Sequence, residues 1–329
     1  MHAPGFSYLA QVNIHEPPSD ENNRILKTEL LPALWNLPPK NPAEASDAFL
    51  EYYMNQRIVI EAHGLNIKTH QDLMDLTNCV KSNAHLTRTR LVAHLDEHCG
   101  WAGPAIHAIE VVLRIWLFIS IDDWDPTQTL EQYLRASFPS TEDFPSNTPS
   151  FPLGFNGFSL KEIGGFDIAW TECLHDHLSF AIDGTQKQLK IFHLSSFLQG
   201  YRHSRDREIL PPAFFEETAR TISLLFPTSN LKCQRWVRKA RTQQDLDLDP
   251  GFLPATSRDL SQFPYWGRQL LELRDEYDRT EPTTVRQWVI DKRKPNQRYT
   301  FWIAVVALFL ALVFGLIQSV TGIIQAIKS

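Results

Sequence analysis

The segment HLDEH, residues 94–98, combines residue types and a spacing that could support metal chemistry. Its order matches H-x-x-E-H, the inverted zinc-protease signature. His94 and His98, four residues apart, would lie on one helix face and could share a metal ion, with Glu97 as general base. The segment ends just before Gly100, and no clear third ligand follows it. We interpret both histidines as surface or hydrogen-bonded core residues. A membrane-bound zinc-dependent hydrolase is the alternative.

A second group of reactive side chains lies in the segment TECLHDHL, residues 171–178. His175 and His177 are two positions apart, so on a helix they point to different faces, and with Cys173 they form no standard metal spacing. The segment contains two acidic residues and no Lys or Arg. Because phosphate contacts need cations, we expect no nucleic-acid binding through it.

A basic stretch follows at residues 231–241. Its cations are Lys232, Arg235, Arg238, Lys239 and Arg241. We interpret it as a solvated helix face; the alternative is binding to anionic lipid or to an acidic partner. The sequence contains no G-x-S-x-G, no P-loop, no G-x-G-x-x-G and no kinase motif set. We therefore assign no catalytic residue, no metal ligand and no cofactor, and favour a non-enzymatic protein.

The composition allows a sizeable hydrophobic core, and it shows no overall excess of positive charge that would indicate nucleic-acid binding. The chain has 329 residues, is 43% hydrophobic and 21% charged, and carries a formal net charge of -6. Its four cysteines lie far apart and form no C-x-x-C. This arrangement favours free thiols in a reducing compartment over a disulfide framework.

The residues near the C-terminus predict a membrane span. Residues 301–317 read FWIAVVALFLALVFGLI, without one polar side chain. Extended to Ile324, the segment would form a helix about 36 Å long. That length crosses a hydrocarbon core of about 30 Å with some tilt. We therefore expect a transmembrane helix over residues 300–327 and not a buried core helix.

The charges that flank this span predict its orientation. The residues before it include a cluster of cations: Arg286, Lys292, Arg293, Lys294 and Arg298. Asp291 is the acidic residue among them, whereas Lys328 is the cation after the span. The positive-inside rule then places the body in the cytosol, with Lys292, Arg293, Lys294 and Arg298 near lipid head groups. We predict a tail-anchored, single-pass protein of the endoplasmic reticulum or another endomembrane.

Small residues form a stripe along the predicted span. They recur at helical spacing at Ala304, Ala307, Ala311, Gly315, Ser319, Gly322 and Ala326. Small side chains let two helix backbones approach closely, and this drives helix association in lipid. The stripe therefore predicts pairing with a second copy or another span; the alternative is a stripe that faces lipid.

A second apolar stretch, residues 105–121, is better interpreted as a buried helix of the body. It contains His107, Glu110 and Arg114. Charged side chains in the middle of a membrane span are costly. Glu110 and Arg114 are four residues apart and can pair on one helix face.

The body is expected to be mainly α with a small β hairpin (α+β). We divide the chain into an extended segment (1–41), a helical domain (42–138), a Pro/Ser/Thr linker (139–158), a winged-helix-like module with further helices (159–244), and a linker with juxtamembrane helices as a stalk (245–298). The winged-helix interpretation rests on the order helix, strand Phe166–Trp170, helix Thr171–His177, and a hairpin of Phe180–Ile182 with Leu189–Phe192.

Three blocks of the chain resemble a large group of uncharacterised fungal proteins. One is the juxtamembrane block and span from Lys292 to Ala326, and another is RDREILPPAFFEETARTISLLFP, from Arg205 to Pro227. The third is GGFDIAWTECLHDHLSF followed by a hairpin that ends in KIFH. The resemblance covers residues 85–327 and implies a fungal source and membrane anchorage, but no catalytic residues.

These observations lead to three functional hypotheses. The first is a tail-anchored interaction or scaffold protein whose body contacts an unknown cytosolic partner. The second is the membrane-bound zinc hydrolase with His94, Glu97 and His98. The third is a structural membrane protein that forms a homo-oligomer through its span. The lipid bilayer is a partner in all three.

Overall fold

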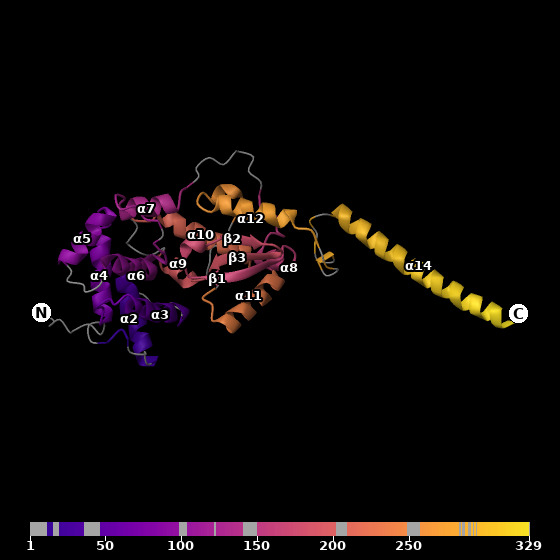
Figure 1. The fold of residues 1–329 in the computed structure, drawn as a ribbon, viewed down its shortest axis with the longest axis horizontal. Helices are drawn as coiled ribbons and strands as arrows, with labels where there is room; N and C mark the ends of the chain where they lie inside the picture. The colour runs from indigo at the N-terminus through magenta and orange to yellow at the C-terminus, as the bar shows by residue number, and fades with distance from the viewer. Residues whose placement is uncertain are drawn as a thin grey trace.

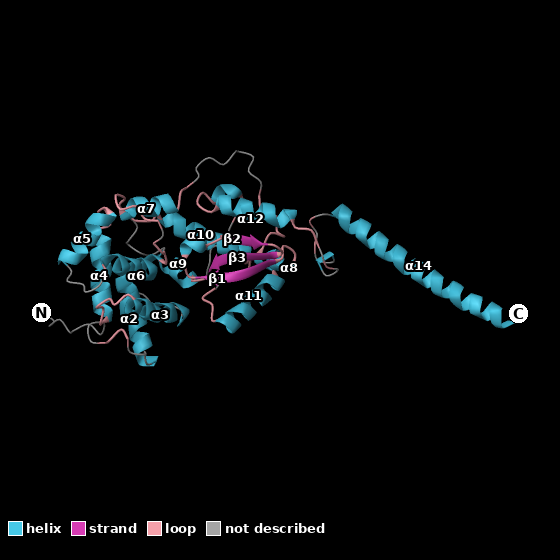
Figure 2. Ribbon diagram, viewed as in Figure 1, coloured by secondary structure: helices cyan, strands magenta, loops and turns pink. Residues whose placement is uncertain are grey.

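The structure is a computed structural model with a folded body and one projecting helix (Figure 1). It describes residues 12–15, 20–35, 47–98, 104–121, 123–140, 150–201, 209–248, 257–282, 284, 287–288, 291, 293 and 295–328. Helices dominate the body, and one small three-stranded sheet lies among them (Figure 2). The predicted α+β class is confirmed.

The N-terminal half of the body consists of helices joined by loops in its described part, with two isolated β-bridges, Asn13–Thr69 and Thr87–Thr129. Its helices are α2 (Asp20–Trp35), α3 (Asp47–Ala62), α4 (His70–Ser82), α5 (Arg88–His98), α6 (Ala105–Leu117) and α7 (Leu130–Ser137). α4 begins after Thr69, whose hydroxyl accepts the Asp72 N–H at 3.1 Å while the Asp72 carboxylate accepts the Thr69 N–H at 2.8 Å. This capping box satisfies backbone donors that the first helical turn leaves free.

The prediction of an extended segment over residues 1–41 is wrong for Asp20–Trp35. These residues form α2, in which Leu26, Leu30 and Leu34 are fully buried. Their spacing of four residues places them on one helix face. The burial of that face against the body outweighs the low helix propensity of the prolines and polar residues around it.

α6 is the central helix of this half. Val111, Leu113 and Trp116 have no solvent exposure, as predicted for a buried helix. α6 ends at Phe118, which adopts a left-handed conformation with φ 56°. The turn puts the Phe118 ring among the core aromatic residues.

The sheet consists of β1 (Phe166–Thr171), β2 (Phe180–Asp183) and β3 (Gln186–Phe192), in the order β1-β3-β2. β2 and β3 form an antiparallel hairpin, as predicted, with Asp183 opposite Gln186. Gly184 has φ 58°, a conformation that glycine adopts without steric cost. β1 pairs with β3 in parallel, from Phe166 opposite Lys187 to Thr171 opposite Phe192.

The predicted recognition helix Thr171–His177 does not form, so the winged-helix interpretation of this module is wrong. Thr171 belongs to β1, and a single 3-10 turn, η2 (Leu174–Asp176), follows. Leu178 then adopts φ 61°, outside the helical region. The chain forms only this one turn because Leu174 and Leu178 are both buried against the sheet region. Leu178 also donates its N–H to the Lys190 carbonyl.

The remaining elements of the body pack around the sheet. They are α8 (Gly157–Glu162), α9 (Ser195–Tyr201), α10 (Pro212–Leu225), α11 (Leu231–Gln244), η3 (Leu260–Gln262) and α12 (Gly267–Arg279). Arg258, just before η3, donates from its guanidinium to the carbonyls of Phe151 at 2.8 Å and Phe155 at 2.6 Å. Residues 150–156 are therefore tied to the body, and residues 141–149 of the predicted linker lie outside the described residues.

One continuous core joins the two halves of the body. Phe118 at the end of α6 lies 4.5 Å from Phe197 of α9, measured between ring centroids, and 5.8 Å from Phe192 of β3. Trp35 of α2 lies 5.1 Å from the same Phe197. The predicted helical domain and the sheet module therefore share their apolar side chains instead of folding around separate cores.

Candidate functional site

The helix that projects from the body is α14 (Pro295–Lys328), drawn in yellow in Figure 1. Its segment Tyr299–Ile323 is 25 residues long, contains an 18-residue stretch with a mean hydropathy of 2.7, and has no buried residue. Large apolar side chains such as Phe309 and Leu316 are more than half exposed. At 1.5 Å per residue the segment is about 37 Å long, so α14 is long and apolar enough to cross a membrane.

The predicted small-residue stripe lies on α14. Its members are Ala304, Ala307, Ala311, Gly315, Ser319, Gly322 and Ala326. A Cβ added to Gly315 or Gly322 would meet nothing within 4 Å. The backbone is therefore open for close approach at these positions, and pairing through them stays a prediction.

The segment just before α14 is clamped to the body. The Arg293 guanidinium pairs with the Asp291 carboxylate at 2.7 Å, donates to the carbonyls of Tyr277 and Thr280, and lies 4.2 Å from the Tyr277 ring centroid. Both charged side chains are mostly buried, at 14% exposure for Arg293 and 4% for Asp291. Arg293 thus binds α12, whereas Lys292, Lys294 and the Arg298 side chain lie outside the described residues.

Aromatic side chains surround the start of α14. Trp288 stacks on Phe301 with ring centroids 4.8 Å apart and an interplanar angle of 5°. Tyr299 and Trp302 are exposed beside them. Trp and Tyr are enriched where a membrane helix meets the head groups, so these aromatic residues at the start of α14 suit a membrane–water interface.

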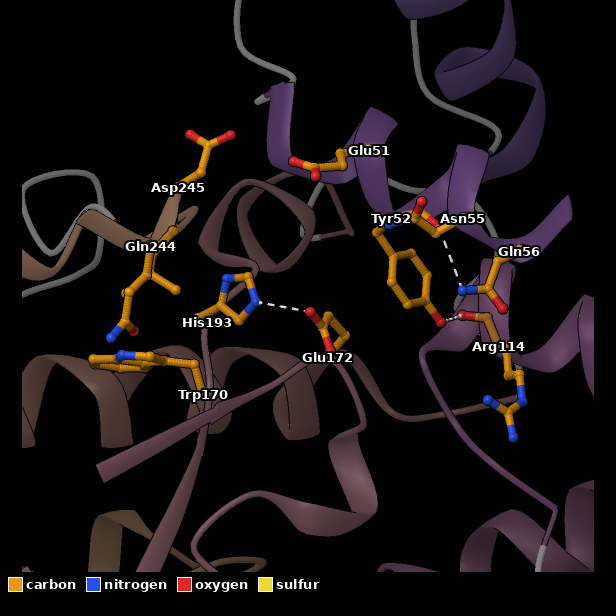
Figure 3. Close-up of a pocket in the computed structure, with 11 residues that line it drawn as sticks. Glu51, Tyr52, Asn55, Gln56, Arg114, Trp170, Glu172, His193, Gln244 and Asp245 are labelled. Carbon is orange, nitrogen blue, oxygen red and sulfur yellow. Dashed lines mark hydrogen bonds and ion pairs between the residues drawn. The ribbon is translucent and has the colours of Figure 1, made fainter. Parts of the chain in front are cut away.

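The body contains a polar cleft with a volume of about 570 Å³ (Figure 3). One wall comes from α3, with Glu51, Tyr52 and Asn55, and from Arg114 of α6. The other comes from β1 and the ends of β3 and α11: Trp170, Glu172, His193, Gln244, Asp245 and Leu246. The cleft therefore lies where the N-terminal helices meet the sheet module.

A histidine–carboxylate pair lies in this cleft. His193 Nε2 is 3.5 Å from Glu172 Oε1 (Figure 3). The hydrogen bond from His193 lowers the pKa of Glu172. The His193 side chain is 7% exposed, and its Nδ1 has no hydrogen-bond partner among the described residues. The pair therefore presents the half-exposed Glu172 carboxylate to the cleft, with a buried ring nitrogen of His193 behind it.

Cys173 follows Glu172 directly. Its Sγ lies 3.5 Å from the hydroxyl of Ser120. Burial acts to raise the pKa of Cys173, but hydrogen bonds from His175 and Ser120 outweigh it and lower that pKa to about 7. The thiolate is the nucleophilic form of cysteine, so this side chain is expected to be reactive.

The two histidines of the segment 171–178 lie in different surroundings. The His177 ring is buried, where it accepts the Phe192 N–H at 3.1 Å and lies 2.7 Å from the Thr221 hydroxyl. Burial lowers the pKa of His177 to about 3. His175 stacks on Phe138 with ring centroids 4.9 Å apart.

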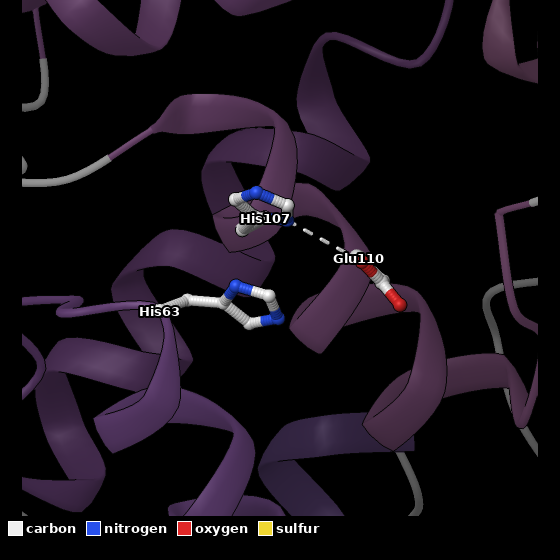
Figure 4. A group of neighbouring side chains, drawn as sticks. All are labelled: His63, His107 and Glu110. Carbon is white, nitrogen blue, oxygen red and sulfur yellow. Dashed lines mark ion pairs between the residues drawn. The ribbon is translucent and has the colours of Figure 1, made fainter.

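The structure places HLDEH on α5, where His94 is half-buried and Glu97 is exposed. The side chain of His98 lies outside the described residues. The described side chains that could hold a metal ion together are a different set, His63, His107 and Glu110 (Figure 4). These residues come from two segments that are distant in sequence, so only the H-x-x-E spacing in α6 could have indicated them.

The cations of α11 face solvent, as predicted for residues 231–241. The exposed side chains are Lys232, Arg235, Arg238, Lys239 and Arg241. The opposite face of α11 buries Cys233, Val237 and Ala240 against the body. α11 is thus an amphipathic surface helix with a solvent-exposed basic face.

Comparisons with known proteins identify no relative. No protein family, no curated protein and no solved structure matches the chain. The resemblance to a fungal group therefore stays a prediction, and the function has to be argued from the geometry above.

Proposed function

We propose that this chain is a single-pass membrane protein that holds a non-enzymatic, cytosolic interaction body at an endomembrane. The observation that carries the proposal is an apolar helix segment, Tyr299–Ile323, in which no residue is buried by the body. Burying apolar surface is worth about 25 cal/mol per Å², so water disfavours this helix strongly and a bilayer accepts it.

The orientation rests on the charges at the two ends of α14. Lys292 and Lys294 precede the helix and Arg298 lies in its first turn, whereas Lys328 is its last residue. Lys and Arg favour the cytosolic side of a membrane. The clamp at Arg293 supports a body held close to that surface, because it fixes the chain two residues before α14 begins.

Membrane insertion is tested by placing a charge near the middle of α14. Leu310→Arg costs about 3 kcal/mol of insertion free energy at the centre of a span. We expect alkaline carbonate to extract this variant and to leave the wild-type chain in the membrane. Leu231→Arg on α11 is the matched control, since Leu231 is also exposed at 66% but belongs to the body. Extraction of the wild-type chain without detergent would overturn the proposal.

Topology is tested separately with a glycosylation acceptor tag placed after Ser329. A cytosolic body puts this tag in the lumen, where it becomes modified. An unmodified tag on a chain that resists carbonate would reverse the proposed orientation while leaving the anchor intact.

The cleft between α3 and the sheet module is the proposed contact site for the cytosolic partner. It combines aromatic walls from Tyr52 and Trp170 with the His193–Glu172 pair, a mixture that suits specific recognition. Asn55 is exposed at the rim, so Asn55→Arg should obstruct the cleft without unfolding α3. Ile58→Arg, exposed on the same helix outside the cleft, is the control. Proteins that co-purify with the full chain in detergent should be lost with the first variant and kept with the second.

A further inference from the structure

Three side chains of types that ligate metals meet on the N-terminal half of the body, and none of them lines the cleft. The ligand atoms of His63, His107 and Glu110 all lie within 4.8 Å of one another (Figure 4). The two imidazole rings are stacked, with centroids 3.9 Å apart and an interplanar angle of 13°. His107 Nδ1 is 3.6 Å from Glu110 Oε2.

Local structure fixes the position of each side chain. His63 follows the last residue of α3, where its N–H donates to the Val59 carbonyl at 3.1 Å. The chain then turns away at Gly64, whose φ is 62°. His107 and Glu110 are three residues apart on α6, so both project from one helix face. The group therefore rests on two helices of the core and not on a loose loop.

One ring nitrogen of the group is buried without a hydrogen bond within the described part of the chain. The Nδ1 atom of His107 is itself inaccessible to solvent, and it makes no hydrogen bond among the described residues. A buried nitrogen without a hydrogen bond is unfavourable, so a ligand that supplies the missing contact is favoured there. The side chains are not sealed off, because His107 is 36% and Glu110 22% exposed. An ion and a water molecule can therefore reach them.

We propose that His63, His107 and Glu110 bind a divalent transition metal, with zinc as the best match. Two imidazoles and one carboxylate are a common three-ligand set for zinc, with water in the fourth position. Ligands at about 2.0 Å in tetrahedral geometry lie about 3.3 Å apart, so the site needs side-chain rotations that bring its atoms closer together. The imidazole rings must tilt out of their parallel stack for their lone pairs to converge.

Glu110 also connects this group to the cleft. Its Oε1 accepts from Arg114 Nη2 at 2.7 Å and from Arg114 Nε at 3.0 Å, and Arg114 lines the cleft. The other oxygen, Oε2, faces His107. Metal binding through Oε2 leaves Oε1 to accept the hydrogen bonds from the guanidinium, and these hydrogen bonds orient the carboxylate toward the ion.

The test uses the full chain in detergent, purified without a histidine tag and stripped of metal by a chelator. Titration with Co²⁺, followed by its visible absorption, and calorimetric titration with Zn²⁺ should each show one ion per chain. His63→Ala, His107→Ala and Glu110→Gln should each weaken binding by more than about 100-fold, because loss of an outer-shell partner alone costs about 10–100-fold. Circular dichroism confirms that each variant is folded, and His63→Gln serves if His63→Ala is not.

The matched control is His94→Ala, which removes a histidine of HLDEH on the same half of the body. This variant should bind Zn²⁺ as the wild-type chain does. Binding that survives His63→Ala and His107→Ala, or that disappears with His94→Ala, would overturn the proposal. So would a wild-type chain that takes up less than one ion.

Discussion

The carboxylate of Glu217 accepts the backbone N–H of Trp266 at 2.6 Å, so a side chain of α10 closes the beginning of α12. It also accepts the Tyr265 N–H at 2.8 Å. Glu217 has no solvent exposure. The first backbone donors of a helix have no partner within the helix itself, and here a buried acid from a distant segment supplies one.

This burial makes stability depend on the charge of Glu217. Burial raises the pKa of Glu217 from 4.5 to about 7, against the opposing hydrogen bonds from Trp266 and Tyr265. Between these values the folded chain holds a proton that the unfolded chain has released, so this group's contribution to stability falls as the pH rises from 4.5 to about 7. Across this pH range, the free energy of unfolding falls by about 3 kcal/mol because of this group.

We therefore predict that Glu217→Gln removes this part of the pH dependence. The amide oxygen still accepts an N–H, but the side chain carries no charge. The variant should gain stability relative to wild type as the pH rises through the same window, measured by urea unfolding in detergent with tryptophan fluorescence. Glu216→Gln, one position along α10, is the control and should follow the wild-type profile. Parallel curves for Glu217→Gln and wild type would contradict the prediction.

The amino-acid pattern predicted the features that depend on local periodicity. The apolar run of α14, the buried helix α6 and the β2–β3 hairpin all follow from spacing within one segment. The sequence pattern does not predict α2, because Leu26, Leu30 and Leu34 lie among polar residues and prolines. Tertiary packing determines the conformation of this segment.

The sites depend on long-range contacts, which spacing does not encode. The cleft brings α3, α6, β1 and the ends of β3 and α11 together. His63 meets His107 only because α3 and α6 pack against each other. The histidines of HLDEH are close in sequence, whereas His63 and His107 are close only in space. The sequence likewise does not predict the parallel pairing of β1 with β3, because the residue pattern of a strand does not specify which strand lies next to it.

Gly157 at the start of α8 has no room for a side chain. A Cβ there would lie 2.3 Å from Cε1 of Phe226, whose ring is buried. Gly157→Ala should therefore destabilise the body by about 1–3 kcal/mol, the usual cost of overpacking a filled core. Gly154→Ala is the control because a Cβ at that position meets nothing within 4 Å. Equal melting temperatures for the two variants would show that Phe226 moves aside at no cost.

Cys173 should be alkylated at neutral pH. With a pKa of about 7, close to half of this thiol is ionised at pH 7. The rate of iodoacetamide labelling of the Cys173 peptide, followed by mass spectrometry, should reach half its maximum near that pH. Burial raises the pKa of Cys233 to about 11, so its peptide should stay unlabelled. His175→Ala removes a hydrogen bond to the thiolate and should move the Cys173 profile to higher pH. A wild-type midpoint above pH 8.5 would refute the assignment.

The small-residue stripe of α14 predicts self-association in the membrane. Gly315 lies near the middle of the stripe, and its exposed backbone allows a second helix to approach closely. Gly315→Leu adds a bulky side chain that clashes with nothing in the chain itself, so the helix and its insertion should be preserved. Crosslinking of the full chain in vesicles should then fall to the level of a monomer. Leu316→Ile, the next residue along the helix, changes shape without blocking the stripe and should crosslink as wild type does. Crosslinking that persists in Gly315→Leu would show that the stripe faces lipid and that any association uses another surface.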